Sequence, residues 1–111
     1  MPVPLHQAKA ELFRTLGHPV RIRVLELLQD GPKAVRQLLA EIEVEPSNLS
    51  QQLAVLRRAG VVTATRDGST VIYALAASDV AELMTAARRF LTEILADRDG
   101  LLDELQRAGS R

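Results

Sequence analysis

The feature that most constrains the fold is a change in the spacing of apolar residues after Gly60. Before it, apolar side chains recur every three to four positions, which is typical of amphipathic helices. Over residues 61–66 and 69–75 the chain is rich in β-branched residues with a two-residue period, which predicts two β-strands. Asp67-Gly68 separates them, and such a pair favours a tight turn in which both residues have positive φ. The sequence therefore predicts a β-hairpin.

Strand pairing across this turn divides the hairpin into two faces. We expect the apolar face to pack on the core: Val62, Ala64, Val71 and Tyr73. We expect the other face to be wet: Thr63, Thr65 and Thr70.

Helical segments precede the hairpin, and a longer one follows it. The predicted segments are residues 7–16, 19–30, 34–42, 46–59 and 79–105. Gly17, Pro19 and Gly60 suit the ends and starts of these helices. Ser78 suits the N-cap of the last helix, which we expect to break at residues 97–100. The order α-α-α-α-β-β-α predicts a mainly α fold with a β-hairpin wing.

Composition favours a single globular domain over residues 1–111. Hydrophobic residues make up 47% of the chain, and there is no cysteine, which excludes disulfides and thiolate metal ligands. The first residues lack the features of a secretory signal and no apolar run would span a bilayer, so we expect a cytoplasmic protein without membrane contact. The net charge is zero, but residues 79–111 hold five arginines and seven acidic residues, so the preceding part is slightly basic.

The predicted helix over residues 46–59 has a polar outer face that lacks carboxylates. If Leu49 faces the core, Leu53 and Leu56 lie within about 40° of it around the helix. The opposite face and its flanks carry hydroxyls, amides and an arginine: Ser47, Asn48, Ser50, Gln51, Ala54 and Arg58. Amides match adenine edges, and arginine matches guanine or phosphate. This face predicts a helix that enters the major groove of DNA, and a merely solvated helix is the alternative.

Three motifs resemble those of the ArsR/SmtB family of winged helix-turn-helix regulators. The first is Leu16-Gly-His-Pro-Val-Arg21-Ile-Arg-Val-Leu-Glu-Leu-Leu28. The second is Pro46-Ser-Asn-Leu-Ser-Gln-Gln-Leu-Ala-Val-Leu-Arg-Arg-Ala-Gly60, and the third is Arg66-Asp-Gly-Ser-Thr-Val-Ile-Tyr-Ala-Leu75. The resemblance covers residues 12–95 and implies a helix-turn-helix over residues 34–59 and a wing over residues 61–75. Gln52 departs from the family pattern, which often has histidine there.

The resemblance implies a transcriptional regulator, most simply a repressor, that binds a palindromic operator in double-stranded DNA as a homodimer. The groove-facing residues would be Ser47, Asn48, Ser50, Gln51 and Gln52. The wing tip would contribute Arg66, Ser69 and Thr70, and the end of the recognition helix Arg57 and Arg58. Ser47 equally suits a helix cap, Arg57 and Arg58 the negative end of a helix, and Arg66 a solvated hairpin flank.

The homodimer would form through helices in residues 7–30 and 79–105. Their apolar residues exceed what one small domain can cover. The expected dimer contacts are Leu12, Phe13, Leu16, Leu83, Ala87, Leu91 and Ile94.

The family's metal-ligand positions hold few ligands in this chain. Ala34 and Arg36 match the family's thiolate motif, and neither can bind a metal. Its last-helix site matches Ala77, Asp79, Phe90 and Glu93, which provide carboxylates and no imidazole. We therefore expect no cofactor and no tight transition-metal site.

The chain has two histidines that could act as metal ligands. His18 precedes Pro19 and favours a structural or capping role. His6 would allow weak nickel or zinc binding if a partner subunit supplied acids such as Asp97, Asp99 or Asp103, and a flexible terminus is the alternative.

Two other functions are alternatives to operator binding without a co-regulator. A winged helix can bind proteins without binding DNA, and the regulatory signal can arrive through a protein co-regulator. Catalysis is not expected, because the chain has no cysteine, no histidine paired with an acid and no phosphate-binding glycine loop.

Overall fold

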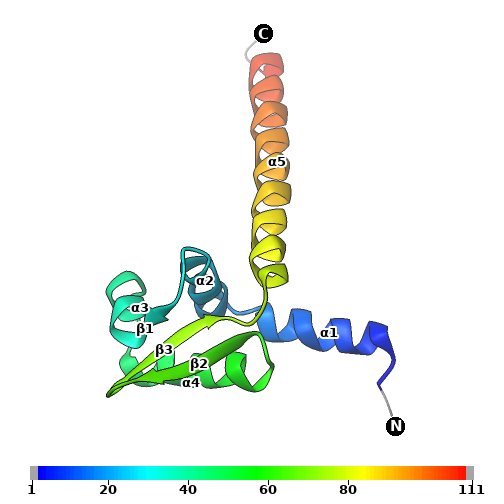
Figure 1. The fold of residues 1–111 in the computed structure, drawn as a ribbon. Coiled ribbons are helices and arrows are strands. Elements are labelled where there is room, and N and C mark those ends of the chain that lie inside the picture. The colour runs from blue at the N-terminus through cyan, green and yellow to red at the C-terminus, as the bar shows by residue number, and fades with distance from the viewer. Residues whose placement is uncertain (1–2, 110–111) are drawn as a thin grey trace. The chain divides into compact units, whose positions relative to one another are not determined.

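The structure, a computed structural model, describes residues 3–109 and groups the chain into two compact units, Met1–Ala81 and Glu82–Arg111. The boundary lies inside the last helix, so no linker separates the units. The first unit holds four helices, the sheet and the first turn of the fifth helix (Figure 1). None of the helices in residues 3–109 is both long and apolar enough to pass through a membrane.

The first two helices are α1 (Leu5–Leu16) and α2 (Pro19–Leu28). Helix α1 starts two residues earlier than predicted, since Pro4 can precede a helix as its N-cap residue. Helix α2 stops two residues earlier, because Gly31 adopts a positive φ of 130° and residues 29–30 form the turn that leads to it. The order of these two helices is as predicted.

A short strand, β1 (Lys33–Ala34), precedes α3 (Val35–Glu41) and was not predicted. It pairs antiparallel with β3 through Lys33 with Tyr73 and Ala34 with Ile72. Two residues are too few to show an alternating pattern, so the sequence placed Ala34 in the following helix. In the structure, the Ala34 backbone N–H instead donates to Oε1 of Gln37 at 2.7 Å and caps the start of α3.

Strands β2 (Val62–Asp67) and β3 (Thr70–Leu75) form the predicted hairpin, and the sheet order is β1-β3-β2 (Figure 1). Asp67 pairs with Thr70, so the turn residues are Gly68 and Ser69 and not Asp67 and Gly68. Only Gly68 has a positive φ, of 65°, as a turn with glycine at its first central position requires. The predicted turn was therefore one residue out of place.

The pairing register confirms the predicted division of the hairpin into two faces. Val62 lies opposite Leu75, and Ala64 opposite Tyr73, so these residues share a face. The threonine face is only partly exposed, because Ile72 is half-buried there. Strand β3 is the central strand and contacts both α2 and α3.

Large aliphatic side chains from α2, α3 and α4 form the core of the first unit. Helix α4 spans Pro46–Arg58 and contacts α2 and β2. The largest fully buried side chains are Val24, Leu25, Leu38, Leu49, Leu53 and Leu56. Each such leucine stabilises the fold by roughly 1.5–3 kcal/mol through its burial. The core thus fixes α4 by one face and leaves the other free.

Helix α5 spans Ser78–Gly109 and is continuous. Ser78 is its first residue and not the residue before it, and the predicted break at residues 97–100 is absent from the described helix. A single glycine costs a helix only about 1 kcal/mol relative to alanine. Gly100 is flanked by good helix formers such as Leu101 and Leu102, so the helix continues through it.

Candidate nucleic-acid interface

Helix α4 turns the face predicted from the sequence toward solvent. Leu49, Leu53 and Leu56 are buried, which confirms the predicted inner face. Exposed side chains on the outer face are Ser47, Ser50, Gln51, Ala54, Arg57 and Arg58, and Asn48 and Gln52 are half-buried. No carboxylate occurs from Pro46 to Arg58, so this face does not repel phosphate.

The start of α4 is set by its local sequence. Glu45, before the helix, has an extended backbone, and Pro46 occupies the first turn, where its missing N–H costs nothing. Ser47 makes no cap contact, because the N-cap position falls on Glu45. The hydroxyl of Ser47 is therefore exposed at the N-terminal end of the helix, where recognition helices meet base edges.

A network of hydrogen bonds joins α4 to α2 and, through Arg21, to α1. The Arg21 Nε donates to Oε1 of Gln52 at 2.7 Å, and the Arg21 Nη1 donates to the Thr15 carbonyl oxygen at 2.9 Å. The Gln52 Nε2 in turn donates to Oδ1 of Asn48 at 2.9 Å. These residues come from α1, α2 and α4 and are partly buried.

Gln52, which was predicted to face the groove, is half-buried and hydrogen-bonded within the protein. Its carbonyl oxygen and its amide nitrogen both have partners within the protein. Arg21 was not predicted to have a role, although it belongs to the first motif. A cation in the first turn of α2 was the available signal, but its partner Gln52 lies 31 residues away in the chain.

The arginines near this face lack carboxylate partners. Within residues 3–109 no ion pair of Arg57, Arg58 or Arg66 is found, whereas Arg14 pairs with Glu11 and Arg23 pairs with Glu26. Arg57 and Arg58 lie in the last turn of α4 and are exposed. Their charges are therefore available to phosphate, although they also stabilise the negative end of the helix.

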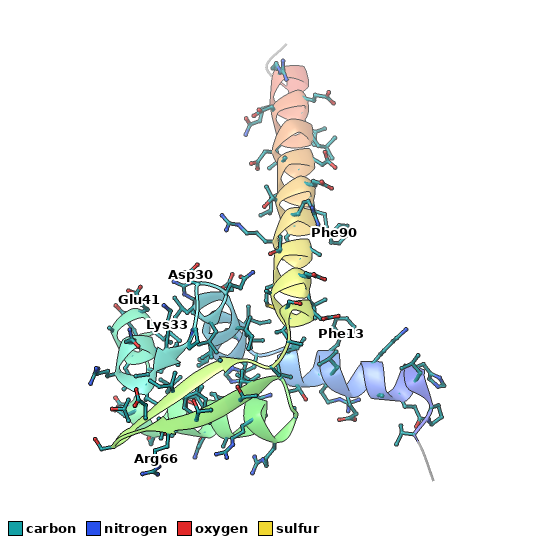
Figure 2. The ribbon with its side chains drawn as sticks, in the orientation of Figure 1. Phe13, Asp30, Lys33, Glu41, Arg66 and Phe90 are labelled. Atoms are coloured by element: carbon teal, nitrogen blue, oxygen red, sulfur yellow. The ribbon has the colours of Figure 1, made fainter. Side chains whose placement is uncertain are left out.

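The wing presents a further cation near its tip. Arg66 lies on β2, is exposed, and extends away from the strand (Figure 2). Ser69 is exposed in the turn, and Thr70 is half-buried at the start of β3. Arg66 pairs across the hairpin with Val71, so its position is set by the ladder next to the turn.

Helix α1 exposes most of its apolar side chains. Phe13, labelled in Figure 2, lies on this helix. It is 58% exposed, and Leu12 is 38% exposed. Leu16, which was expected at the dimer interface, is only 4% exposed within a single chain. It lies in the last turn of α1, where the chain enters the folded unit, and contributes to the core instead.

Helix α5 carries a long apolar stripe. Ala87 and Leu91 are exposed, and Leu83 and Ile94 are half-buried. Other large apolar side chains on this helix are more than half exposed and were not assigned to a contact: Phe90, Leu95, Leu101, Leu102 and Leu105. The break wrongly predicted at residues 97–100 explains why the last three were left out of the stripe, because α5 continues through these positions.

The two histidines occupy different surroundings. The His18 Nδ1 accepts a hydrogen bond from the Val20 backbone N–H at 3.2 Å, which confirms the predicted capping role. His6 is exposed on α1. Among residues 3–109, no three side chains of histidine, aspartate or glutamate converge as a metal site would require.

Comparisons with known proteins agree with this arrangement. A sequence profile described as "Bacterial regulatory protein, arsR family" matches residues 18–64. The HTH-type transcriptional regulator Rv0081 of Mycobacterium tuberculosis is 54% identical over 108 residues, covering 96% of this chain and 95% of the relative. The biofilm growth-associated repressor of Agrobacterium fabrum is 36% identical over 90 residues, covering 78% of this chain and 77% of the repressor.

Solved structures show the same fold. The crystal structure of Rv0081 from M. tuberculosis superposes with a TM-score of 0.80 at 55% identity, covering 87% of this chain and 98% of the other. A homodimeric winged helix-turn-helix DNA-binding domain from Mycobacterium bovis superposes with a TM-score of 0.75 at 28% identity, covering 82% and 84%. With the acid-free recognition helix and the wing, these matches show that the chain is a DNA-binding transcriptional regulator of the ArsR family, with the winged helix-turn-helix fold.

Proposed function

We propose that two copies of this chain bind one palindromic operator, each placing its α4 in the major groove and its wing on the backbone. The observation that carries this proposal is the outer face of α4, which is polar, free of carboxylates and bordered by Arg57 and Arg58. Phosphate attracts such a face, and hydroxyls and amides can read base edges.

Within α4, the contacts divide by position. Ser47, Ser50 and Gln51 are exposed toward the helix N-terminus and would meet base edges. Arg57 and Arg58 lie at the other end and would meet phosphates, which fix the register of the protein on DNA. Arg66, with Ser69 and Thr70 beside it, would contact phosphate or the minor groove from the wing.

The dimer would form through α1 and α5. Support comes from the exposed Phe13 on α1 and from Ala87 and Leu91 on α5, since exposed apolar clusters of this kind mark interaction surfaces. The related M. bovis domain is homodimeric. A two-fold axis would set the recognition helices roughly 34–36 Å apart, one turn of DNA.

We further propose that the protein represses its target genes, as the similar A. fabrum protein is a repressor by name. The inducing signal would reach it through a protein co-regulator or through weak nickel or zinc binding at His6, which is exposed. The metal route needs the dimer, because the carboxylates near His6 would come from the partner subunit.

A selection from random DNA tests the proposal. The purified protein is mixed with a random duplex pool, retained DNA is sequenced, and the complex is sized by sedimentation. We expect an enriched palindrome whose half-sites lie about one helical turn apart, bound by two copies. Retention without any enriched sequence, or of single half-sites by a monomer, would contradict the proposal.

A further inference from the structure

In the hydrogen bonds among Arg21, Gln52 and Asn48, only one assignment of donors and acceptors is possible. A guanidinium has five N–H donors and no acceptor. The group of Gln52 that lies 2.7 Å from the Arg21 Nε must therefore be the carbonyl oxygen Oε1. This requirement settles which way the Gln52 amide is turned, since its two ends are otherwise alike in shape.

The orientation of the Gln52 amide determines the orientation of the Asn48 amide. With its oxygen on Arg21, Gln52 directs its Nε2 toward Asn48, one helical turn earlier on α4. An N–H donor needs an acceptor, so the Asn48 atom at 2.9 Å is Oδ1. The amide nitrogen of Asn48 is then not used in this network, and no hydrogen bond from it to another described residue is found.

Arg21 is itself held in place. Its Nη1 donates to the Thr15 carbonyl oxygen, in the last turn of α1, where helix carbonyls lack intrahelical partners. The guanidinium is thus fixed at two points, on α1 and on α4, and cannot rotate without breaking one of them. A lysine would keep the charge and lose this two-point geometry.

From this chain of contacts we infer that Arg21, acting through Gln52, makes Asn48 a hydrogen-bond donor only toward DNA. An asparagine free to turn can offer donor and acceptor together and so pair with adenine. Asn48 directs its oxygen at Gln52, so the N–H groups at the other end of its amide are the ones it presents to DNA. It therefore favours a base edge that only accepts, which is guanine through O6 and N7 or thymine through O4, over adenine, whose N7 accepts but whose N6 amino group also needs an acceptor.

The inference rests on the proposed function and adds to it a positioning role for Arg21 and Gln52. Asn48 is the third residue of α4 and is half-buried, at the end of the helix that meets bases. Its neighbours Ser47 and Gln51 are exposed and carry no such constraint. The restriction is thus specific to one position of each half-site.

The test compares base preferences in the random-pool selection for wild type, Gln52→Glu and Asn48→Asp. A glutamate at position 52 can still accept from Arg21 but can no longer donate, so Asn48 turns its nitrogen inward and its oxygen outward. Asn48→Asp presents an acceptor directly and differs by a single atom. At the base that Asn48 contacts, we expect both variants to shift preference from guanine or thymine toward cytosine or adenine, by about tenfold.

Two controls separate this effect from added charge or misfolding. In the double variant Asn48→Ala/Gln52→Glu the shift should disappear, because the outward oxygen is gone while the added charge remains. In the free protein, the Arg21 Nε proton should exchange slowly with solvent by NMR, and Gln52→Leu should accelerate that exchange at least tenfold.

The outcomes separate failure of the donor-only role of Asn48 from failure of the proposed operator binding. If wild type enriches no sequence at all, the proposed operator binding is wrong and the inference falls with it. If wild type enriches a palindrome and Gln52→Glu and Asn48→Asp enrich the same bases, operator binding stands and the donor-only role of Asn48 is wrong. Fast exchange of the Arg21 Nε proton in wild type would also overturn the inference.

Discussion

The imidazole of His18 caps α2 by accepting a hydrogen bond from the Val20 backbone N–H at 3.2 Å. Serine, threonine, asparagine and aspartate usually perform this task, because a side-chain acceptor at the N-cap satisfies an orphan N–H of the first turn. Here Pro19 is the first helical residue and has no N–H of its own. The first N–H of α2 that needs a partner is therefore that of Val20, and His18 accepts it.

We therefore expect His18→Ala to lower the free energy of unfolding by about 1 kcal/mol. His18→Asn should restore most of it, since asparagine is among the best N-cap residues. Urea unfolding followed by circular dichroism measures both. Equal stability of wild type and His18→Ala would mean that the cap contributes nothing.

Gln51→Ala should weaken binding to the selected operator by about 1–3 kcal/mol and leave binding to random duplex nearly unchanged, because Gln51 is exposed on the reading face of α4. Fluorescence anisotropy with both duplexes measures the difference. An equal loss on both would assign Gln51 to the backbone.

Arg66→Ala should weaken binding to operator and random duplex alike, since its guanidinium has no carboxylate partner among residues 3–109 and is free to neutralise phosphate. The slope of log affinity against log salt should flatten by about one phosphate contact. Arg66→Lys serves as the matched control. A loss confined to the operator would contradict the assignment.

Leu91→Glu should shift the protein from dimer to monomer in sedimentation at micromolar concentration, because a charge would be buried at the proposed α5 interface. Ala96→Glu is the matched control, since Ala96 is exposed and lies on nearly the opposite side of the same helix. Dissociation by both variants, or by neither, would place the interface elsewhere.

Titration calorimetry with nickel and zinc should show no binding tighter than micromolar. Any weak heat should vanish in His6→Ala, because the Nδ1 of the other imidazole, His18, is engaged in the helix cap. Submicromolar binding that survives His6→Ala would point to the region of Asp79 and Glu93 instead.

Much of the fold follows from local sequence patterns. The buried leucines of α4 and the two faces of the hairpin could be predicted because periods of 3.6 and 2 residues decide them. The turn was misplaced because glycine suits both the second central position of one turn type and the first of another, and strand register decides between them.

Features that depend on distant partners could not be read in this way. Nothing near Gln52 indicates that Arg21 engages it, since the contact exists only after α2 packs on α4. Leu16 fits an exposed stripe and a core equally well by periodicity, and only the folded unit shows that it is buried. Strand β1 forms solely because β3 lies beside it.

The sheet order β1-β3-β2 also bears on how readily the wing could aggregate in solution. Strand β2 has β3 on one side only, so its outer edge offers backbone N–H and C=O groups that could recruit a strand from another molecule. Threonines and two consecutive charged residues, Arg66 and Asp67, line that strand and discourage such aggregation. Arg66 thus discourages strand pairing in addition to its proposed contact with phosphate, and a neutral alanine there would remove both properties at once. Light scattering on the Arg66 variants will therefore decide whether lost DNA binding reflects a lost contact or lost soluble protein.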